Sequence, residues 1–144
     1  MRPAHRLMSA RWNLVWGSIF CGLSVALGAL AAHALADVLG DRGLAVYQTA
    51  VRYQTLHGLA LLAIGVYRAR YQSDGASAIG DRWLGIAGLL FVVGIVLFSG
   101  SLYVLALGGP RFFGPVTPVG GLLFLGGWAL AASGFFRSTT ASAG

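Results

Sequence analysis

Three ionisable side chains lie inside or beside long apolar stretches of this sequence: His33, Arg52 and His57. A titratable or charged group in such a setting is costly and is by default a functional hypothesis. Arginine carries a fixed positive charge with paired donors that suit a carboxylate or a lipid phosphate. Histidine can form hydrogen bonds or bind a metal. These three residues are therefore the first place to look for chemistry.

Other polar side chains gather at a similar depth. With the middle of each apolar stretch at the bilayer centre and a rise of about 1.5 Å per residue, they fall in the outer half of the membrane. This predicts a polar binding pocket, open to the outer face, formed by His33, Gln48, Arg52, Tyr53, Gln54, His57, Ser99, Ser101 and Thr117. Two alternatives stay open: Arg52 extends to the interface from a half-exposed helix, and Gln54 forms a cross-helix hydrogen bond instead of contacting a ligand.

The two histidines raise haem or metal binding as an alternative, since two imidazoles can hold haem iron axially. Their depths differ by about 15 Å or about 5 Å, depending on how the second apolar stretch sits in the bilayer, and only the smaller gap permits pairing. Asp37 could add a metal ligand, and with Asp41 it extends a row from His33 that could relay protons. The other interpretation of this row is the solvated end of a helix. We expect no cofactor, no metal site, and histidines that form hydrogen bonds within the protein.

The composition is that of a membrane protein. Of 144 residues, 57% are hydrophobic and 10% are charged, and the mean hydropathy is +0.76, whereas soluble domains carry about 25% charge. The net charge is +6, but the ten arginines are scattered without interleaved aromatic residues, so we expect no nucleic-acid partner. A single cysteine, Cys21, excludes an internal disulfide and a cysteine zinc site. Phosphate-loop, zinc-protease and serine-hydrolase motifs are missing from the sequence, so we expect no catalytic residues and no enzyme activity.

Four stretches are long and apolar enough to be membrane helices, which need about 20 residues. They cover about residues 12–36, 43–67, 83–107 and 112–136. We predict an all-α integral membrane four-helix bundle that forms one domain over residues 1–144. Seven arginines fall on the side that holds both chain ends, which predicts cytoplasmic N- and C-termini. The polar residues 72–80 predict a flexible link between the second and third spans.

Two features of the apolar stretches have alternative explanations. The basic start and the first apolar run permit a signal peptide, but the run exceeds the usual 7–15 residues of such a core. Small residues at four-residue spacing let helices approach closely, and they predict either a dimer face or packing within one molecule. These rows are Ser24, Gly28, Ala32 and Ala36, and Gly127 and Ala131.

Four motifs, taken in order, resemble one known family. Residues 28–33 read Gly-Ala-Leu-Ala-Ala-His, and residues 47–57 read Tyr-Gln-Thr-Ala-Val-Arg-Tyr-Gln-Thr-Leu-His. Residues 97–103 read Leu-Phe-Ser-Gly-Ser-Leu-Tyr, and residues 117–121 read Thr-Pro-Val-Gly-Gly, with Trp128 further along. Together they are similar to the YgdD/YwdK family of small bacterial inner-membrane proteins, although the first motif departs from the expected Gly-Ala-Phe-Gly-Ala-His. The resemblance implies four membrane helices and an uncleaved first segment. It implies no activity, because the family is uncharacterised.

We therefore expect a small multi-pass protein of the cell inner (plasma) membrane that acts as a non-catalytic accessory or lipid-interacting component. Membrane lipids are the expected partners, and a homo-oligomer or a membrane-protein partner stays open. One alternative is a transporter or channel subunit with an outward pocket around Arg52 and His57. The other is a redox subunit with haem between His33 and His57.

Overall fold

The computed structural model describes residues 9–71 and 78–140, and most of these residues are helical. In chain order the elements are α1 (Ala10–Leu30), a π-helical turn η1 (Ala31–Leu35), α2 (Ala36–Tyr71), α3 (Ala78–Ala106), a short 3-10 helix η2 (Arg111–Phe113) and α4 (Val116–Thr140). The first helix begins after Ser9, whose hydroxyl accepts a hydrogen bond from the backbone N–H of Trp12. This contact satisfies one of the donors that every helix start leaves free.

The prediction of a four-helix bundle is wrong. In the described part of the chain, three helices are long and apolar enough to cross a membrane: Ala10–Arg70, Ile79–Ala106 and Arg111–Ser138. The predicted spans 12–36 and 43–67 both fall in the first of these, a helical segment of 61 residues. The polar residues between them indicated a loop, but they are helical, because η1 continues the hydrogen bonding from α1 into α2.

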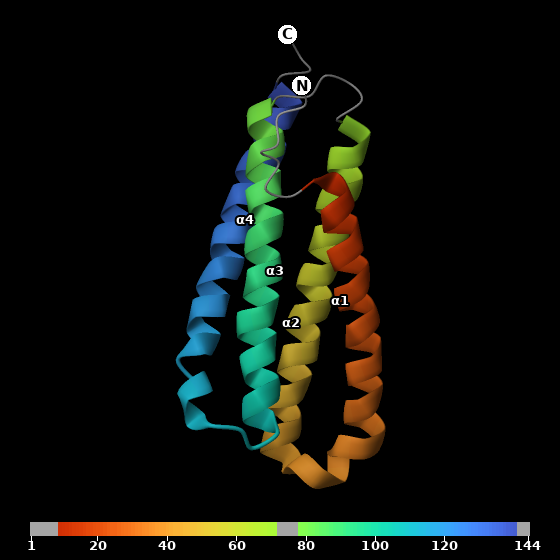
Figure 1. Ribbon diagram of the computed structural model, residues 1–144, viewed down its shortest axis with the longest axis vertical. Coiled ribbons are helices and arrows are strands. Elements are labelled where there is room, and N and C mark those ends of the chain that lie inside the picture. The colour runs from red at the N-terminus through yellow and green to blue at the C-terminus, as the bar shows by residue number, and fades with distance from the viewer. Residues whose placement is uncertain (1–8, 72–77, 141–144) are drawn as a thin grey trace.

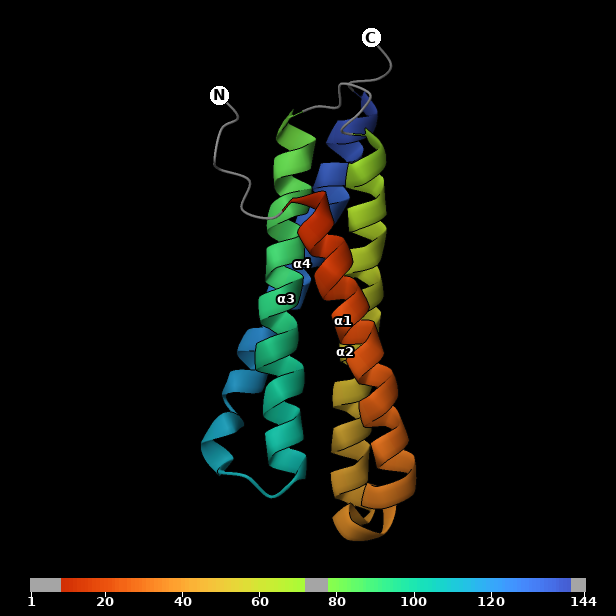
Figure 2. The ribbon, with the colours of Figure 1, turned by 45° about the vertical axis from the view of Figure 1, so that its right-hand side comes forward.

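This first segment changes direction at Gly40. Its φ of 62° and ψ of 171° lie in a region that essentially only glycine adopts. As a result α1 and α2 lie side by side in both side views (Figures 1 and 2). The turn from η1 into α2, which contains Gly40, lies at the same end of the molecule as η2, whereas α1 begins and α4 ends at the other end (Figure 1). We call the first of these the Gly40 end. That the chain termini face the cytoplasm stays a prediction.

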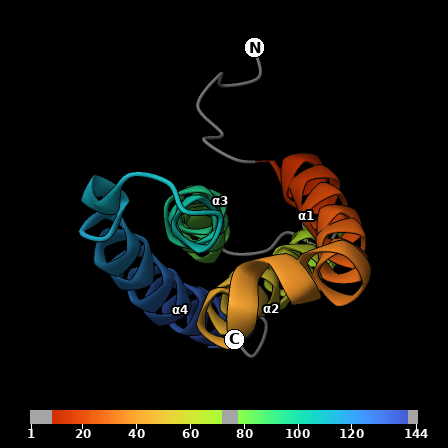
Figure 3. The ribbon, with the colours of Figure 1, turned by 90° about the horizontal axis from the view of Figure 1, so that it is seen from below.

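The helices pack in sequence order. The extensive contacts run from α1 to α2, from α2 to α3 and from α3 to α4. The core lies where α2, α3 and α4 meet, around Leu61, Phe91 and Phe124. Seen from the Gly40 end, α4 starts apart from α2 and slants toward it (Figure 3). These two helices are therefore farther apart at the Gly40 end than toward the end of α4 (Figure 3).

Glycine sets the closest approach of α3 and α4. At Gly120 an added Cβ would lie 2.5 Å from the backbone nitrogen of Phe98. Part of the predicted small-residue rows packs within the molecule in the same way: an added Cβ at Gly127 would lie 2.5 Å from the ring of Phe91, and Ser24 and Ala131 are buried. Ala32 is exposed. Arg2, Arg6 and residues 72–77 of the predicted link lie outside the described residues.

A buried ion pair joins α2 and α3 at the end opposite Gly40. Arg68 is only 2% exposed, and its Nε and Nη2 atoms donate to the two carboxylate oxygens of Asp81 at 2.8 and 3.1 Å. Close to this end, the guanidinium of Arg137 lies 5.3 Å from the centre of the Trp83 ring. Arginine and tryptophan side chains are typical of the membrane–water interface, so we assign one boundary of the hydrocarbon layer to the level of Arg68.

Candidate functional site: a lateral groove between α2 and α4

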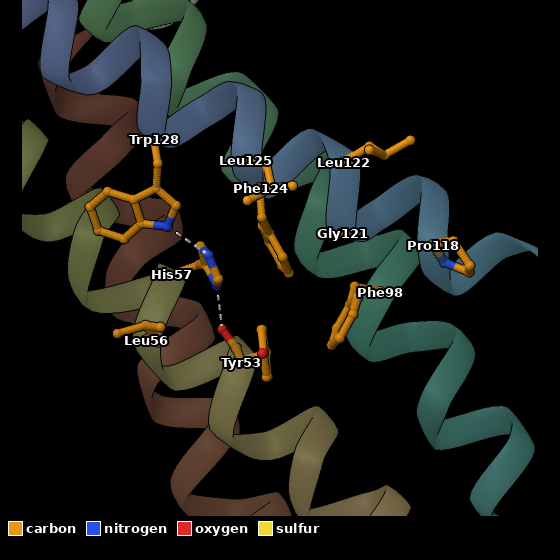
Figure 4. Close-up of a pocket in the computed structure, with 10 residues that line it drawn as sticks. All are labelled: Tyr53, Leu56, His57, Phe98, Pro118, Gly121, Leu122, Phe124, Leu125 and Trp128. Atoms are coloured by element: carbon orange, nitrogen blue, oxygen red, sulfur yellow. Dashed lines mark hydrogen bonds between the residues drawn. The ribbon is translucent and has the colours of Figure 1, made fainter.

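A groove of about 530 Å³ opens on the side of the molecule between α2 and α4 (Figure 4). Ligand sites typically enclose about 300–1,000 Å³, so this volume is that of a binding site. We call it the lateral groove. It is lined by Tyr53, Leu56 and His57 of α2, Phe98 of α3, and Pro118, Gly121, Leu122, Phe124, Leu125 and Trp128 of α4.

His57 lies at the floor of the lateral groove and is 2% exposed. Its Nδ1 atom lies 2.8 Å from the carbonyl oxygen of Tyr53. Because a carbonyl only accepts, Nδ1 carries the hydrogen, and the lone pair of Nε2 then accepts the indole N–H of Trp128 at 3.1 Å. The imidazole is neutral in this arrangement, and both of its nitrogens are engaged. This bond also ties α2 to α4 across the groove.

Aromatic rings complete the floor. The rings of His57 and Phe124 are stacked, with centroids 3.5 Å apart and planes 6° from parallel. Phe98 contacts Tyr53 on one side and Phe124 on the other, with ring centroids 4.6 and 5.4 Å away. Ring contacts of this kind hold the side chains in defined positions, so the groove is preformed.

Several of the predicted pocket residues form hydrogen bonds between helices. The amide of Gln54 donates to the carbonyl oxygen of Phe20 in α1 and accepts from the hydroxyl of Tyr103 in α3, both at 3.1 Å. Ser99 donates to the carbonyl oxygen of Ala50 at 2.9 Å. Gln54 is thus a cross-helix hydrogen bonder, and the same role falls to Ser99.

The structure does not bring the nine predicted pocket residues into one site. Tyr53 and His57 line the lateral groove, and the hydroxyls of Ser101 and Thr117 pair with each other 2.7 Å apart, between α3 and α4. The other predicted members are exposed on the outside of the molecule: His33, Gln48 and Arg52. That the whole set binds a ligand stays a prediction without a common cavity to support it.

The two histidines lie far apart. Relative to Gly40, His33 lies seven residues before and His57 seventeen residues after, which at about 1.5 Å per residue separates their depths by about 15 Å. His33, Asp37 and Asp41 are each exposed, and the non-helical Gly40 interrupts the helical row that their spacing predicted. In the described part of the chain, no group of three or more metal-binding side chains lies together.

Sequence reasoning missed most of the groove. Its wall on α4 consists mainly of apolar residues, whose types do not indicate any chemistry. The spacing of Gly121, Leu125 and Trp128 was the one feature that could have indicated it, because residues three and four apart share a helix face. The ion pair of the buried Arg68 with Asp81 was missed as well, because the position of Arg68 beside the loop suggested a role in topology alone. Asn13 went unnoticed too: it is fully buried, and its side-chain nitrogen and oxygen have no hydrogen-bond partner among the described residues.

Comparisons with known proteins identify relatives over most of the chain. A family described as "Protein of unknown function (DUF423)" matches residues 27–121. The UPF0382 inner membrane protein YgdD of Escherichia coli K12 is 40% identical over 130 residues, which cover 90% of this chain and 93% of that protein. A UPF0382 membrane protein of Staphylococcus haemolyticus is 41% identical over 124 residues, which cover 86% of this chain and 94% of the relative. No solved structure matches. These findings confirm the predicted resemblance and the predicted location in the inner (plasma) membrane.

Proposed function

The chain belongs to the DUF423 family of membrane proteins of unknown function, and we propose that it is a non-catalytic lipid-binding protein that holds the hydrocarbon chain of a membrane lipid in the lateral groove. The observation that carries this proposal is the chemistry of the groove surface. Phe98, Phe124 and the aliphatic lining residues offer carbon atoms only. The polar atoms at the floor, in His57 and Trp128, are satisfied by each other and by the Tyr53 carbonyl.

The hydrogen bonds of His57 and Trp128 affect which kind of ligand can bind at the floor of the groove. At His57 and Trp128 a polar ligand would have to break an existing hydrogen bond to gain a new one, whereas a hydrocarbon chain leaves both bonds in place. The one other polar side-chain atom of the lining is the Tyr53 hydroxyl. Van der Waals packing against a preformed surface is what drives association inside a bilayer, since lipid tails are as apolar as the protein. The groove therefore suits a flexible apolar chain better than a polar solute.

The lateral groove also opens where such chains are found. Leu56, Leu122, Leu125 and Trp128 line it, and between 44% and 68% of each side chain is exposed on the outer surface of the helices. From Pro118 to Trp128 it follows ten residues of α4, or about 15 Å along the helix. A lipid can enter sideways from its own leaflet without leaving the membrane.

The other expected functions have less support. A haem between His33 and His57 would need Nε2 of His57 to give up Trp128 and would need His33 to approach by about 15 Å. A transport pathway around Arg52 would need that side chain to face inward, whereas it is exposed on the outside of α2. The expected lack of a cofactor, and a homo-oligomer or membrane-protein partner, stay predictions.

Filling the lateral groove is expected to expel the lipid. An added Cβ at Gly121 would meet nothing closer than the Phe98 ring at 3.8 Å, so Gly121→Leu fits the backbone and places its side chain in the groove. Native mass spectrometry of protein released from mild detergent should show lipid adducts on the wild type. The adduct fraction should fall about fivefold in Gly121→Leu, which corresponds to about 1 kcal/mol of lost packing.

Gly22→Leu is the matched control. Gly22 lies inside α1, no atom lies within 4 Å of an added Cβ, and the residue is exposed away from the groove. Both variants replace a helix glycine and gain about 1 kcal/mol of helix propensity, so neither should lose thermal stability. A wild type without lipid adducts, or equal adduct fractions in all three proteins, would refute the proposed function.

A further inference from the structure

We infer that the lipid in the lateral groove is an anionic phospholipid whose phosphate is bound by Arg52 at the rim of the groove. This inference rests on the proposed function, because it assigns the headgroup of the lipid whose chain occupies the groove. It rests on the place of Arg52 on α2, on the absence of an ion pair at Arg52 within the described residues, and on the depth that helix length gives it.

Arg52 flanks the mouth of the lateral groove. It is exposed, and it lies one residue before Tyr53 and four before Leu56, both of which line the groove. Residues four apart on a helix are neighbours on one face, so the guanidinium lies about one turn nearer to the Gly40 end than the side chain of Leu56. A lipid whose chain follows the groove toward Trp128 therefore has its headgroup beside Arg52.

Arg52 has no counterion among the residues that the structure describes. Its side chain makes no ion pair or hydrogen bond within residues 9–71 and 78–140. Asp41 lies eleven residues earlier in α2, or about 16 Å away along the axis. A charge inside a membrane segment normally pairs with an opposite charge or reaches polar headgroups, and a lipid phosphate supplies the partner that the described residues do not.

The side chain of Arg52 can reach the level of the lipid phosphates. Arg68 marks the hydrocarbon boundary at the opposite end, and sixteen residues of helix place Arg52 about 24 Å from it. With a hydrocarbon layer of about 30 Å, the Cα of Arg52 lies about 6 Å inside the boundary on the Gly40 side. A side chain of this length extends to the phosphate level from there. Guanidinium donors form paired hydrogen bonds with phosphate oxygens.

Trp128 provides a probe for the test, because it lines the lateral groove. The protein with Trp12→Phe, Trp16→Phe and Trp83→Phe keeps Trp128 alone. It is placed in phosphatidylcholine bilayers that contain a small fraction of lipid with brominated chains, which quench indole fluorescence on contact. Brominated phosphatidylglycerol is compared with brominated diacylglycerol, which has the same chains and no phosphate. A second variant keeps only Trp12, which is 55% exposed on α1, and reports the surrounding bilayer.

Phosphatidylglycerol should be favoured over diacylglycerol about fivefold at Trp128, and Arg52→Gln should remove this preference, since one arginine near the surface contributes about that factor for an anionic lipid. Arg42→Gln, at an exposed arginine of the same end, should keep the preference. Inorganic phosphate in solution should leave the quenching unchanged. Equal quenching by the two lipids, or a preference that survives Arg52→Gln, would overturn the headgroup inference alone. Quenching of Trp128 no stronger than that of Trp12 would overturn the proposed function as well.

Discussion

Replacing Gly120 with alanine is expected to lower the free energy of unfolding by about 3 kcal/mol, the upper end of the cost of overpacking a core. The new Cβ would lie 2.5 Å from the backbone nitrogen of Phe98 and 2.8 Å from its Cα. A flexible side chain could rotate away, but backbone atoms of α3 can yield only if the whole helix moves. Unfolding by denaturant in mild detergent, followed by circular dichroism, measures the effect.

The neighbouring glycine is the control for this prediction. At Gly121 the added Cβ would lie 3.8 Å from the Phe98 ring, which is ordinary contact. Gly121→Ala should therefore leave stability unchanged or raise it by up to about 1 kcal/mol through helix propensity. Equal effects of the two alanines would contradict the close approach of α3 and α4 at Gly120.

Asp81→Asn is expected to destabilise the protein by about 3–5 kcal/mol, because it removes the carboxylate that accepts two hydrogen bonds from the buried guanidinium of Arg68. The pair is held by two hydrogen bonds of 2.8 and 3.1 Å, and Arg68 is only 2% exposed. The same denaturant unfolding measures the loss, and near-ultraviolet circular dichroism reports whether α2 and α3 still pack.

The double variant Arg68→Met with Asp81→Leu tests whether the loss of stability comes from the buried charge of Arg68, which this variant removes together with the Asp81 carboxylate. Replacing a whole buried ion pair by apolar side chains of similar size is often neutral, so most of the stability should return. Arg82→Gln, at an exposed arginine next to Asp81, should change stability by less than about 0.5 kcal/mol. If the double variant is as unstable as Asp81→Asn, the buried charge of Arg68 does not cause the loss of stability in Asp81→Asn.

The helical and membrane character of the fold could be predicted from the sequence, and the number of helices could not. Long apolar stretches bounded by arginines mark helices on length and hydropathy alone. The polar residues between Ala36 and Gly43 indicated a loop, but helical hydrogen bonding continues through η1, and a single glycine with positive φ reverses the chain. A change of direction at one residue leaves no trace in a hydropathy pattern.

For the candidate site, the sequence indicated how far along each span a polar residue lies, but not on which side of its helix. Counting residues along each span placed Ser99 and Arg52 in the same half of the membrane. It gave no information on which side of its helix each residue lies, because helices that are apolar on all sides carry no amphipathic signal. The structure turns Gln54 and Ser99 into the protein and Arg52 outward. The groove itself depends on the slant of α4 relative to α2, which no local pattern encodes.

An experimental density map of the protein in a lipid bilayer tests the central claim most directly, for example from crystals grown in a lipidic phase. The account predicts elongated density along the lateral groove, beginning beside Arg52, passing Phe98 and Phe124, and ending near Trp128. A groove closed by its own side chains, with α4 packed against α2 and no lipid density between them, would contradict it.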